Sequence, residues 1–213
     1  MEENFSKYLL LDRFNVSRET CINFERYISL IIEKNQKINI ISKKTEKISI
    51  IRKRHIIDSA QAIDFIDKND TICSDLGSGG GFPGIVLAIM MKKINRSMKF
   101  KLYEKSHLKS IFLRDVSKEL KLNTEVIERN VFEIDNLKSD TVIARAFKPL
   151  PVILELMSKN FSNYKNLILF MGKKGKQTLK DAFKVWKFEY KEKMSLTSED
   201  SFLIKIKNIK KKI

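Results

Sequence analysis

The stretch DLGSGGGFPG, Asp75 to Gly84, decides how this 213-residue chain folds. The chain has only seven glycines, and five of them lie within this stretch. Glycine lacks a Cβ atom, so it accepts positive φ angles and lets a ligand approach the backbone closely. Pro83 suits the first turn of a helix, where its missing N–H group costs nothing. We therefore expect a strand, then a turn that lines a nucleotide-like ligand, then a helix.

Beyond Lys68, short β-rich segments alternate with amphipathic helices such as His107–Leu122. Strands separated by helices of this length imply right-handed βαβ units and a parallel, doubly wound sheet. The segments Trp186–Leu196 and Ser201–Ile209 leave no room for a helix between them, so they should pair antiparallel at one edge. The expected parallel strands are Thr71–Leu76, Phe100–Glu104, Thr124–Arg129, Thr141–Ala146 and Leu167–Met171.

The first 66 residues have a different pattern, without glycine or proline. Apolar residues at helical spacing predict one helix over Cys21–Ile38, with Ser17 as its N-cap, and a second over Ile51–Ile66. We expect residues 1–66 to form a helical extension packed on a core domain of residues 67–213.

The formal charge of +16 favours association with a polyanion, and nucleic acid is the leading candidate. An amino-acid composition rich in Lys, Ile and Asn can also reflect codon bias across a genome. The charge therefore suggests a kind of partner without choosing one.

The longest apolar run, Ile85–Met91, is far too short to span a bilayer, and no tract resembles a signal peptide. Cys21 and Cys73 are the only cysteines and lie far apart, so we expect buried, reduced thiols rather than a disulfide or a zinc site. These features predict a cytoplasmic protein with no membrane partner and no metal.

The glycine stretch favours S-adenosylmethionine (AdoMet) over other nucleotide ligands. Gly79–Gly84 formally matches the dinucleotide fingerprint GxGxxG, but a lone match of that kind is weak. Asp75 stands two residues before Gly77, which gives DxGxGxG, the arrangement common to class I AdoMet methyltransferases. Glu104 falls at the end of the second strand, where its carboxylate can take ribose hydroxyls of AdoMet or of NAD. A purely structural turn remains an alternative, and the phosphate-loop pattern GxxxxGK[ST] is absent.

From about Ile28 onward, the chain resembles the bacterial 16S ribosomal RNA guanine-N7 methyltransferase family. This family is also called ribosomal small-subunit methyltransferase G or glucose-inhibited division protein B. The RHxxDS element, combined with the GFPGI form of the glycine stretch, is far more specific than AdoMet binding in general. The segments that carry the resemblance are NQKINIIS, RHIIDS, DLGSGGGFPGIVLAI, KSIFLRDVSKELKL, VIARAF and GKKGK.

The resemblance implies a class I AdoMet-methyltransferase, Rossmann-like fold. We expect a mostly parallel seven-stranded sheet with an antiparallel C-terminal edge strand and an N-terminal helical cap. The implied reaction moves the methyl group of AdoMet to N7 of a guanine in the 530 loop of 16S ribosomal RNA and leaves S-adenosylhomocysteine. The implied partner is this RNA, within the 30S subunit or an assembly intermediate, and we expect a monomer. Methylation of another RNA, such as transfer RNA, and a catalytically silent AdoMet- or RNA-binding module are the alternatives.

The family's cofactor contacts fall here on Gly77, Phe82, the Val131–Phe132 pair and Arg145. Asp75, Gly79 and Glu104 complete the predicted cofactor site. Phe132 replaces an acidic residue common in the family, so an adenine contact there would use backbone or ring stacking.

Guanine N7 has a lone pair and no proton, so attack on the methyl group needs no general base. Well-oriented reactants reach effective molarities on the order of 10⁵ to 10⁸ M, which makes alignment the main catalytic device. No [DN]PP[YF] tetrapeptide follows the fourth strand, where the sequence reads RAFKPLP, and neither cysteine adjoins a proline as a nucleophile would require. We predict no catalytic residue, with Arg145 the one candidate for a direct part.

Several side chains have a structural as well as a functional interpretation. Asp75 either organises the ligand or caps the loop, and Arg145 contacts cofactor or RNA, or forms a structural ion pair. Phe82 either stacks on the adenine or packs under the loop. The candidate RNA-side residues are Asn39, Arg54, His55, Asp58, Lys173, Lys174 and Lys176. For the RHxxDS residues the alternative is a hydrogen-bonded brace between cap and sheet, and for the lysines it is a solvated helix start.

Overall fold

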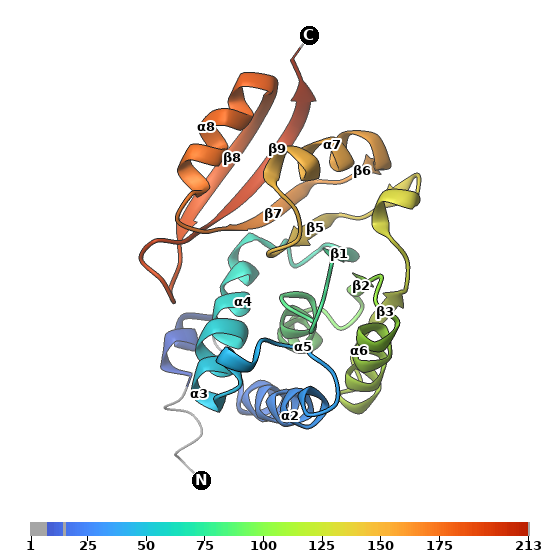
Figure 1. Cartoon of the computed structure of the whole chain (residues 1–213), viewed down its shortest axis with the longest axis vertical. Helices are drawn as coiled ribbons and strands as arrows, with labels where there is room; N and C mark the ends of the chain where they lie inside the picture. Colours follow the sequence, from blue (N-terminus) through green and yellow to red (C-terminus); the bar gives the residue numbers. More distant parts are fainter. Residues whose placement is uncertain (1–7, 15, 213) are drawn as a thin grey trace.

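A seven-stranded sheet in the order β3-β2-β1-β5-β7-β9-β8 organises the computed structural model, which describes residues 8–14 and 16–212 (Figure 1). The first five strands in this order, β3, β2, β1, β5 and β7, are parallel, as the alternation of strands and helices predicted. Strand β9 runs antiparallel to β7 and to the edge strand β8, so the expected antiparallel edge is confirmed. The strands are β1 Ile72–Leu76, β2 Lys99–Tyr103, β3 Thr124–Ile127, β5 Thr141–Ala144, β7 Asn166–Met171, β8 Trp186–Met194 and β9 Phe202–Lys211.

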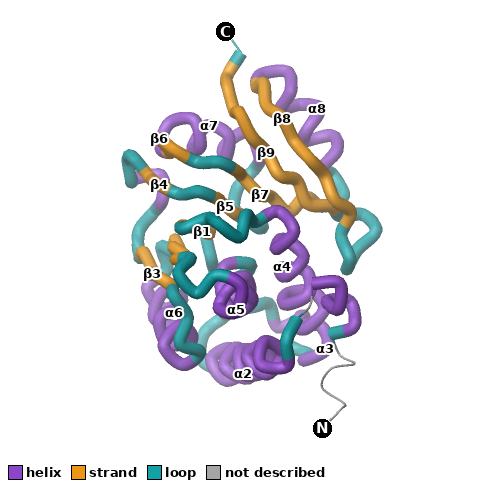
Figure 2. The backbone as a smooth tube through the Cα atoms, turned by 180° about the vertical axis from the view of Figure 1, so that it is seen from behind, coloured by secondary structure: helices purple, strands orange, loops and turns teal. Residues whose placement is uncertain are grey.

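Helices cover both faces of this sheet (Figures 1 and 2). The sheet therefore separates two apolar clusters, one on each face. One apolar cluster joins the N-terminal helices, α5 and α6 to sheet residues such as Phe100 and Ile143. The other joins α7 and α8 to the opposite face, at residues such as Val142 and Ile204. The principal helices are α2 Arg18–Asn35, α5 Gly84–Ile94, α6 His107–Glu119, α7 Leu150–Asn160 and α8 Gly175–Val185.

The described N-terminal part includes the 3₁₀ helix η1, Leu9–Phe14. Ser17 caps α2 as predicted, because its side chain accepts a hydrogen bond from Thr20 N at 3.3 Å. The predicted second helix over Ile51–Ile66 is present as an uninterrupted helical run over residues 48–65, but its hydrogen-bond pattern changes along the run. The segment is divided into α3 Ile48–Ile51, a π-helical turn η3 Arg52–Ile57, the short α4 Asp58–Ala60 and a 3₁₀ turn η4 Gln61–Phe65.

The π turn has an identifiable cause. In an α-helix the carbonyl of Arg54 would accept from the N–H of Asp58. Here that carbonyl accepts from the guanidinium of Arg145 at 2.6 Å. The N–H of Asp58 donates instead to the backbone carbonyls of Lys53 and His55. A side chain inserted into the backbone ladder widens or kinks a helix at that point.

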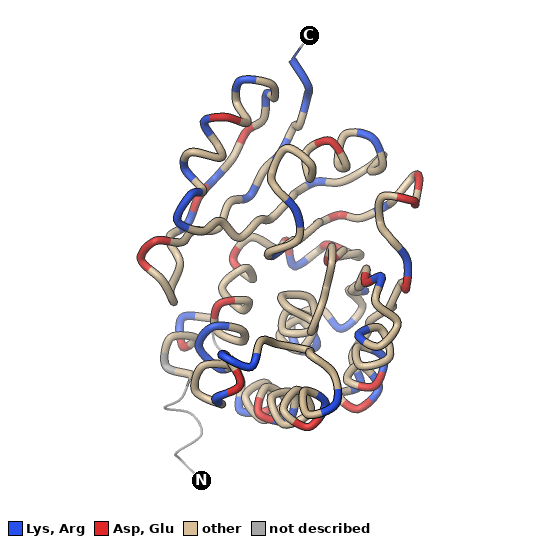
Figure 3. The backbone as a smooth tube through the Cα atoms, in the orientation of Figure 1, with Lys and Arg blue, Asp and Glu red and all other residues tan. Residues whose placement is uncertain are grey.

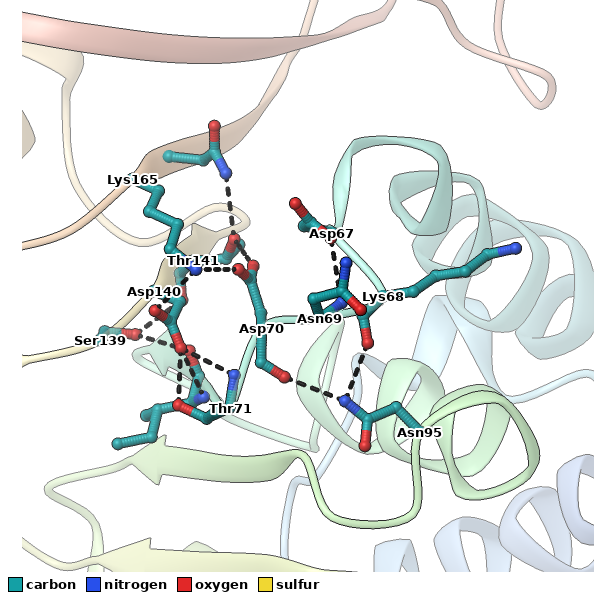
Figure 4. Close-up of polar contacts among 12 residues, drawn as sticks. Asp67, Lys68, Asn69, Asp70, Thr71, Asn95, Ser139, Asp140, Thr141 and Lys165 are labelled. Carbon is teal, nitrogen blue, oxygen red and sulfur yellow. Dashed lines mark hydrogen bonds and ion pairs between the residues drawn. The ribbon is translucent and has the colours of Figure 1, made fainter.

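A second set of polar contacts ties the amino ends of β1, β5 and β7 together (Figure 4). The buried carboxylate of Asp70 accepts from the hydroxyl of Thr141 at 2.6 Å and from the ammonium of Lys165 at 3.0 Å. Asp140 accepts from the N–H and hydroxyl of Thr71 at 2.7 and 2.8 Å. These bonds fix the register of the parallel strands at the end of the sheet opposite the glycine stretch.

A separate two-stranded sheet, which the sequence did not predict, is formed by β4 Leu137–Lys138 and β6 Phe161–Asn163. Two 3₁₀ turns are η2 Lys43–Thr45 and η5 Val131–Glu133. Cys21 and Cys73 are buried free thiols, as expected. Within the described ranges, no helix has both the length and the apolar character needed to cross a membrane.

Candidate functional site

The glycine stretch forms the turn between β1 and α5, at the carboxyl ends of the parallel strands. Gly77, Gly79 and Gly81 have φ angles of 69°, 57° and 94°, which side chains rarely tolerate. A Cβ atom at Gly77 would also lie 2.3 Å from Cδ2 of Phe147. The predicted strand-turn-helix arrangement is therefore present, with bare backbone facing the crevice where a doubly wound sheet binds its ligand.

Asp75 lies beneath this turn, with 1% of its surface exposed. Its Oδ2 atom accepts from Gly84 N at 3.0 Å, at the start of α5, while Oδ1 is buried without a partner among the described residues. Burial raises the pKa of the carboxyl to about 7. The geometry matches the loop-capping interpretation, so any influence of Asp75 on a ligand passes through the shape of the loop.

Glu104, which directly follows β2, faces the glycine turn from the neighbouring strand. Its Oε2 accepts from Gly79 N at 2.9 Å, and its Oε1 accepts from Ser106 N at 2.8 Å. Each carboxylate oxygen has two lone pairs, so both keep an acceptor site for a ribose hydroxyl. The structure thus brings Glu104 together with Gly77 and Gly79 at one edge of the crevice.

Val131 and Phe132 lie at the next strand end, in the turn η5. Val131 is buried, whereas Phe132 is 37% exposed and stacks on Phe147, with ring centroids 5.9 Å apart and planes 19° apart. Phe147 also rests against Gly77, so it spans the crevice between the turns after β1, β3 and β5. Phe147 belongs to the VIARAF segment, but it was not among the predicted site residues. The direction of its ring depends on the preceding residue, Ala146, which has a φ of 51°. A positive φ at an alanine cannot be predicted from the sequence.

Phe82 packs inward between the helical cap and the loop. It stacks on His55 at 4.7 Å between ring centroids and lies 5.5 Å from Tyr27, whose hydroxyl donates to the carbonyl of Gly80. Only 8% of Phe82 is exposed. This environment fits the packing alternative, and it shows that Tyr27, which the sequence did not single out, fixes the loop from the side of α2.

The RHxxDS element joins the cap to the sheet through Asp58. Its Oδ2 lies 3.1 Å from the Arg145 guanidinium, and its Oδ1 accepts from Thr197 Oγ1 at 2.6 Å, in the turn between β8 and β9. Arg145 follows β5 directly and also lies over the ring of Phe170, 5.8 Å from its centroid. The structural interpretations of Asp58 and Arg145, a brace and an ion pair, are both realised.

His55 is neutral at physiological pH, because burial, followed by the charges of Arg145 and Arg54, lowers its pKa to about 4. Its Nε2 lies 3.4 Å from the hydroxyl of Thr45, and its Nδ1 is buried without a partner among the described residues. The side chain of Arg54 is exposed. Asn39 is exposed in the turn before Ile40, whose Cγ2 lies close to Gly80, so that turn borders the glycine loop.

A hollow of 390 Å³ adjoins the crevice between the turns that follow β5 and β7. Phe147, Pro149 and Phe170 give it apolar walls, and Lys148, Lys173 and Lys174 give it positive charge. Phe147 is shared with the crevice, so the two spaces meet at that ring. Lys176 points elsewhere, because its ammonium pairs with Glu192 and lies over Phe202. Of the three predicted lysines, the structure therefore brings Lys173 and Lys174 to the site.

Comparisons with known proteins agree with this geometry. The family model described as rRNA small subunit methyltransferase G matches residues 20–204. The ribosomal RNA small subunit methyltransferase G of Pelagibacter ubique is 58% identical over 212 residues, covering 100% of both chains. The protein of the same name from Ruegeria pomeroyi is 34% identical and covers 92% of this chain and 94% of its own length.

Among solved structures, M. jannaschii TYW2 in complex with AdoMet is similar with a TM-score of 0.51 at 18% identity. The match covers 74% of this chain and 76% of that chain. Similarity at this level of identity concerns the fold alone. It confirms the predicted class I AdoMet-methyltransferase architecture.

Proposed function

The chain belongs to the ribosomal RNA small subunit methyltransferase G family, and from this membership we propose that it methylates N7 of a guanine in the 530 loop of 16S ribosomal RNA, with AdoMet as methyl donor. The observation that carries the proposal is the glycine turn with Glu104 on one side and the lysine-lined hollow on the other, joined at Phe147. This arrangement provides a cofactor crevice and a substrate space in contact with each other.

The residues present fit AdoMet. Gly77 and Gly79 leave bare backbone at positive φ, and Glu104 keeps acceptor sites for ribose hydroxyls. Phe132 and Phe147 offer exposed aromatic surface at the strand ends, where the adenine of a nucleotide would lie. When bound, AdoMet supplies an electrophilic methyl group on a positively charged sulfur.

The hollow fits a nucleobase that has left its stack. Phe147 and Phe170 provide aromatic walls for a flat ring, and Lys173 and Lys174 can contact the flanking phosphates. Extruding a base costs a few kcal/mol, which contacts of this kind would offset. His55 and the turn that contains Asn39 border the glycine loop on its other side, and together with the exposed Arg54 they are candidates for RNA contact.

Methyl transfer to guanine N7 requires mainly that the protein align the guanine with the methyl group of AdoMet. Guanine N7 presents a lone pair and no proton, so no side chain has to remove one. The buried Asp75 and the half-buried His55 lie next to the loop and hold its shape, while Arg145 is engaged by Asp58 and the Arg54 carbonyl. We assign these residues to positioning, consistent with a reaction in which orientation provides most of the rate enhancement.

The charge of +16 supports an RNA substrate, and a ribosomal substrate places the reaction in the cytoplasm, on the 30S subunit or an assembly intermediate. The test is transfer of a labelled methyl group from AdoMet to three substrates: unmethylated 30S subunits, naked 16S RNA and transfer RNA. We expect incorporation with the first, the second or both. Labelling of transfer RNA alone would reassign the substrate, and AdoMet binding without labelling of any RNA would indicate a silent binding module.

A further inference from the structure

One face of the β8–β9 hairpin carries exposed lysines and no covering helix. On β8, Trp186 and Phe188 are buried toward α8, and the alternate positions Lys187 and Lys191 are exposed on the other face. Figure 2 shows this face directly, with β8 and β9 in front and α8 behind them. Figure 3 shows how Lys and Arg recur along the two strands.

The register places like charges opposite each other. Lys187 is paired with Lys210 across the two strands, and Lys191 is paired with Lys205. Directly opposed like charges destabilise an antiparallel pair. Lys205 is half-buried and donates to the carbonyl of Phe65 at 3.0 Å. Its pKa is lowered first by burial and then by the charge of Lys207, while Asp70 and Asp67 raise it and Lys191 lowers it.

The fold neutralises little of this charge, since the register places Glu189 opposite Lys207 but leaves Lys187 and Lys191 facing lysines. Among the residues that the structure describes, Lys187, Lys191, Lys207 and Lys210 form no ion pair, and the one carboxylate on the face, Glu189, accepts from Asn208 Nδ2 at 2.8 Å.

Two lysines of the neighbouring helix α8 are paired. Lys176 pairs with Glu192, and Lys184 pairs with Asp181. On the uncovered face, by contrast, four lysines without an ion pair among the described residues lie together on two adjacent strands.

We propose that this lysine face, formed by Lys187, Lys191, Lys207 and Lys210, docks the phosphate backbone of ribosomal RNA outside the methyl-transfer site. The proposal rests on the proposed function, because it takes RNA as the substrate. A row of cations along two strands suits a linear polyanion, and at about 3.3 Å per residue it extends roughly 13 Å from Lys187 to Lys191. The exposed positions of the face carry no large apolar side chain that could enter a lipid surface.

The test uses two full-length variants with the same change in charge. The first replaces Lys187, Lys191, Lys207 and Lys210 with Gln, and the matched control replaces the exposed lysines Lys37, Lys93, Lys118 and Lys180 with Gln. RNA affinity is measured by titrating a 16S RNA fragment that contains the 530 loop, at several salt concentrations. Thermal melting, AdoMet affinity and the methylation rate at saturating RNA are measured alongside.

We expect the lysine-face variant to bind the RNA at least tenfold more weakly. Its slope of log affinity against log salt should fall by roughly 3, since each lost phosphate contact removes about 0.7 to 0.9. Its Tm should be unchanged or higher because repulsion is removed, and its AdoMet affinity and saturated rate should match the parent.

Equal losses in the two variants would mean that only net charge matters, and unchanged RNA affinity would show that the face does not bind RNA. Either result overturns the inference while methylation by the parent leaves the proposed function standing. If the parent neither binds nor methylates the RNA, both fail. Loss of binding to phosphatidylglycerol vesicles, with RNA affinity intact, would assign the face to a membrane surface instead.

Discussion

The guanidinium of Arg145 lies 3.1 Å from the carboxylate of Asp58, which ties the end of strand β5 to the N-terminal helices. The same guanidinium takes the Arg54 carbonyl out of the helical ladder and so produces the π turn η3. Asp58 reaches further, to Thr197 in the turn between β8 and β9. One ion pair therefore connects three parts of the chain that surround the candidate site.

Replacing Asp58 with Asn should lower the free energy of unfolding by about 1–3 kcal/mol, since a partly buried Arg145 loses its charged partner. The measurement is equilibrium urea unfolding. Asp181→Asn, at the exposed pair with Lys184, is the matched control and should cost under about 1 kcal/mol. Equal effects in the two variants would show that the brace adds no stability beyond a surface pair.

Gly77→Ala should weaken AdoMet binding at least tenfold, because the new Cβ would meet Phe147 at 2.3 Å at a φ of 69°. Gly172→Ala is a suitable control, since a Cβ atom at that position would have no neighbour within 4 Å. Calorimetric titration with AdoMet compares the two. Unchanged affinity in Gly77→Ala would place the cofactor elsewhere.

Glu104→Gln should weaken AdoMet binding by roughly 10- to 100-fold, about 1.4–2.8 kcal/mol, because a charged acceptor for ribose hydroxyls becomes neutral. Glu125→Gln, on the exposed side of β3, should leave the affinity as it is. Competition between AdoMet and its 2′-deoxyribose analogue provides a sharper readout. The parent should discriminate against the analogue, and a variant that keeps this discrimination would remove Glu104 from the ribose site.

His55 and Asp75 should give opposite pH dependences of stability. The pKa of His55 falls from 6.5 to about 4 on folding, so its contribution is present above pH 6.5 and is lost as the pH falls through 4. The pKa of Asp75 rises from 3.8 to about 7, so its contribution is present below pH 3.8 and is lost as the pH rises through 7.

Between pH 4 and 6.5 the two slopes oppose each other in the parent protein. His55→Asn should therefore make stability fall more steeply with rising pH, and Asp75→Asn should make it rise. Urea unfolding at pH 4.5, 5.5 and 6.5 measures the slopes. If both substitutions changed the slope in the same direction relative to the parent, the assigned protonation states would be contradicted.

The sequence predicted the sheet and the glycine turn because both depend on local signals, namely alternating apolar segments and residues that accept positive φ. It placed Glu104 beside the turn for the same reason, since the carboxyl ends of parallel strands share one edge. It could not predict the π turn, which requires Arg145 to enter a helix far away in the chain. Phe147 was missed because its position against Gly77 depends on how the chain turns after β5, where the strand ends at Ala144 and not at Ala146.

The boundary between a helical extension of residues 1–66 and a core of 67–213 stays a prediction, as does the monomeric state. The contacts of the cap are extensive, since Tyr27, Phe82 and His55 pack against one another at the loop itself.

The central claim is the site of methylation, and one measurement addresses it directly. Unmethylated 30S subunits are incubated with the purified protein and AdoMet, and N7-methylguanine is mapped by borohydride and aniline cleavage. We predict a single new cleavage in the 530 loop that weakens with Gly77→Ala and persists with Gly172→Ala at saturating RNA. Incorporated methyl label without cleavage at any guanine, or cleavage outside the 530 loop, would contradict the proposal.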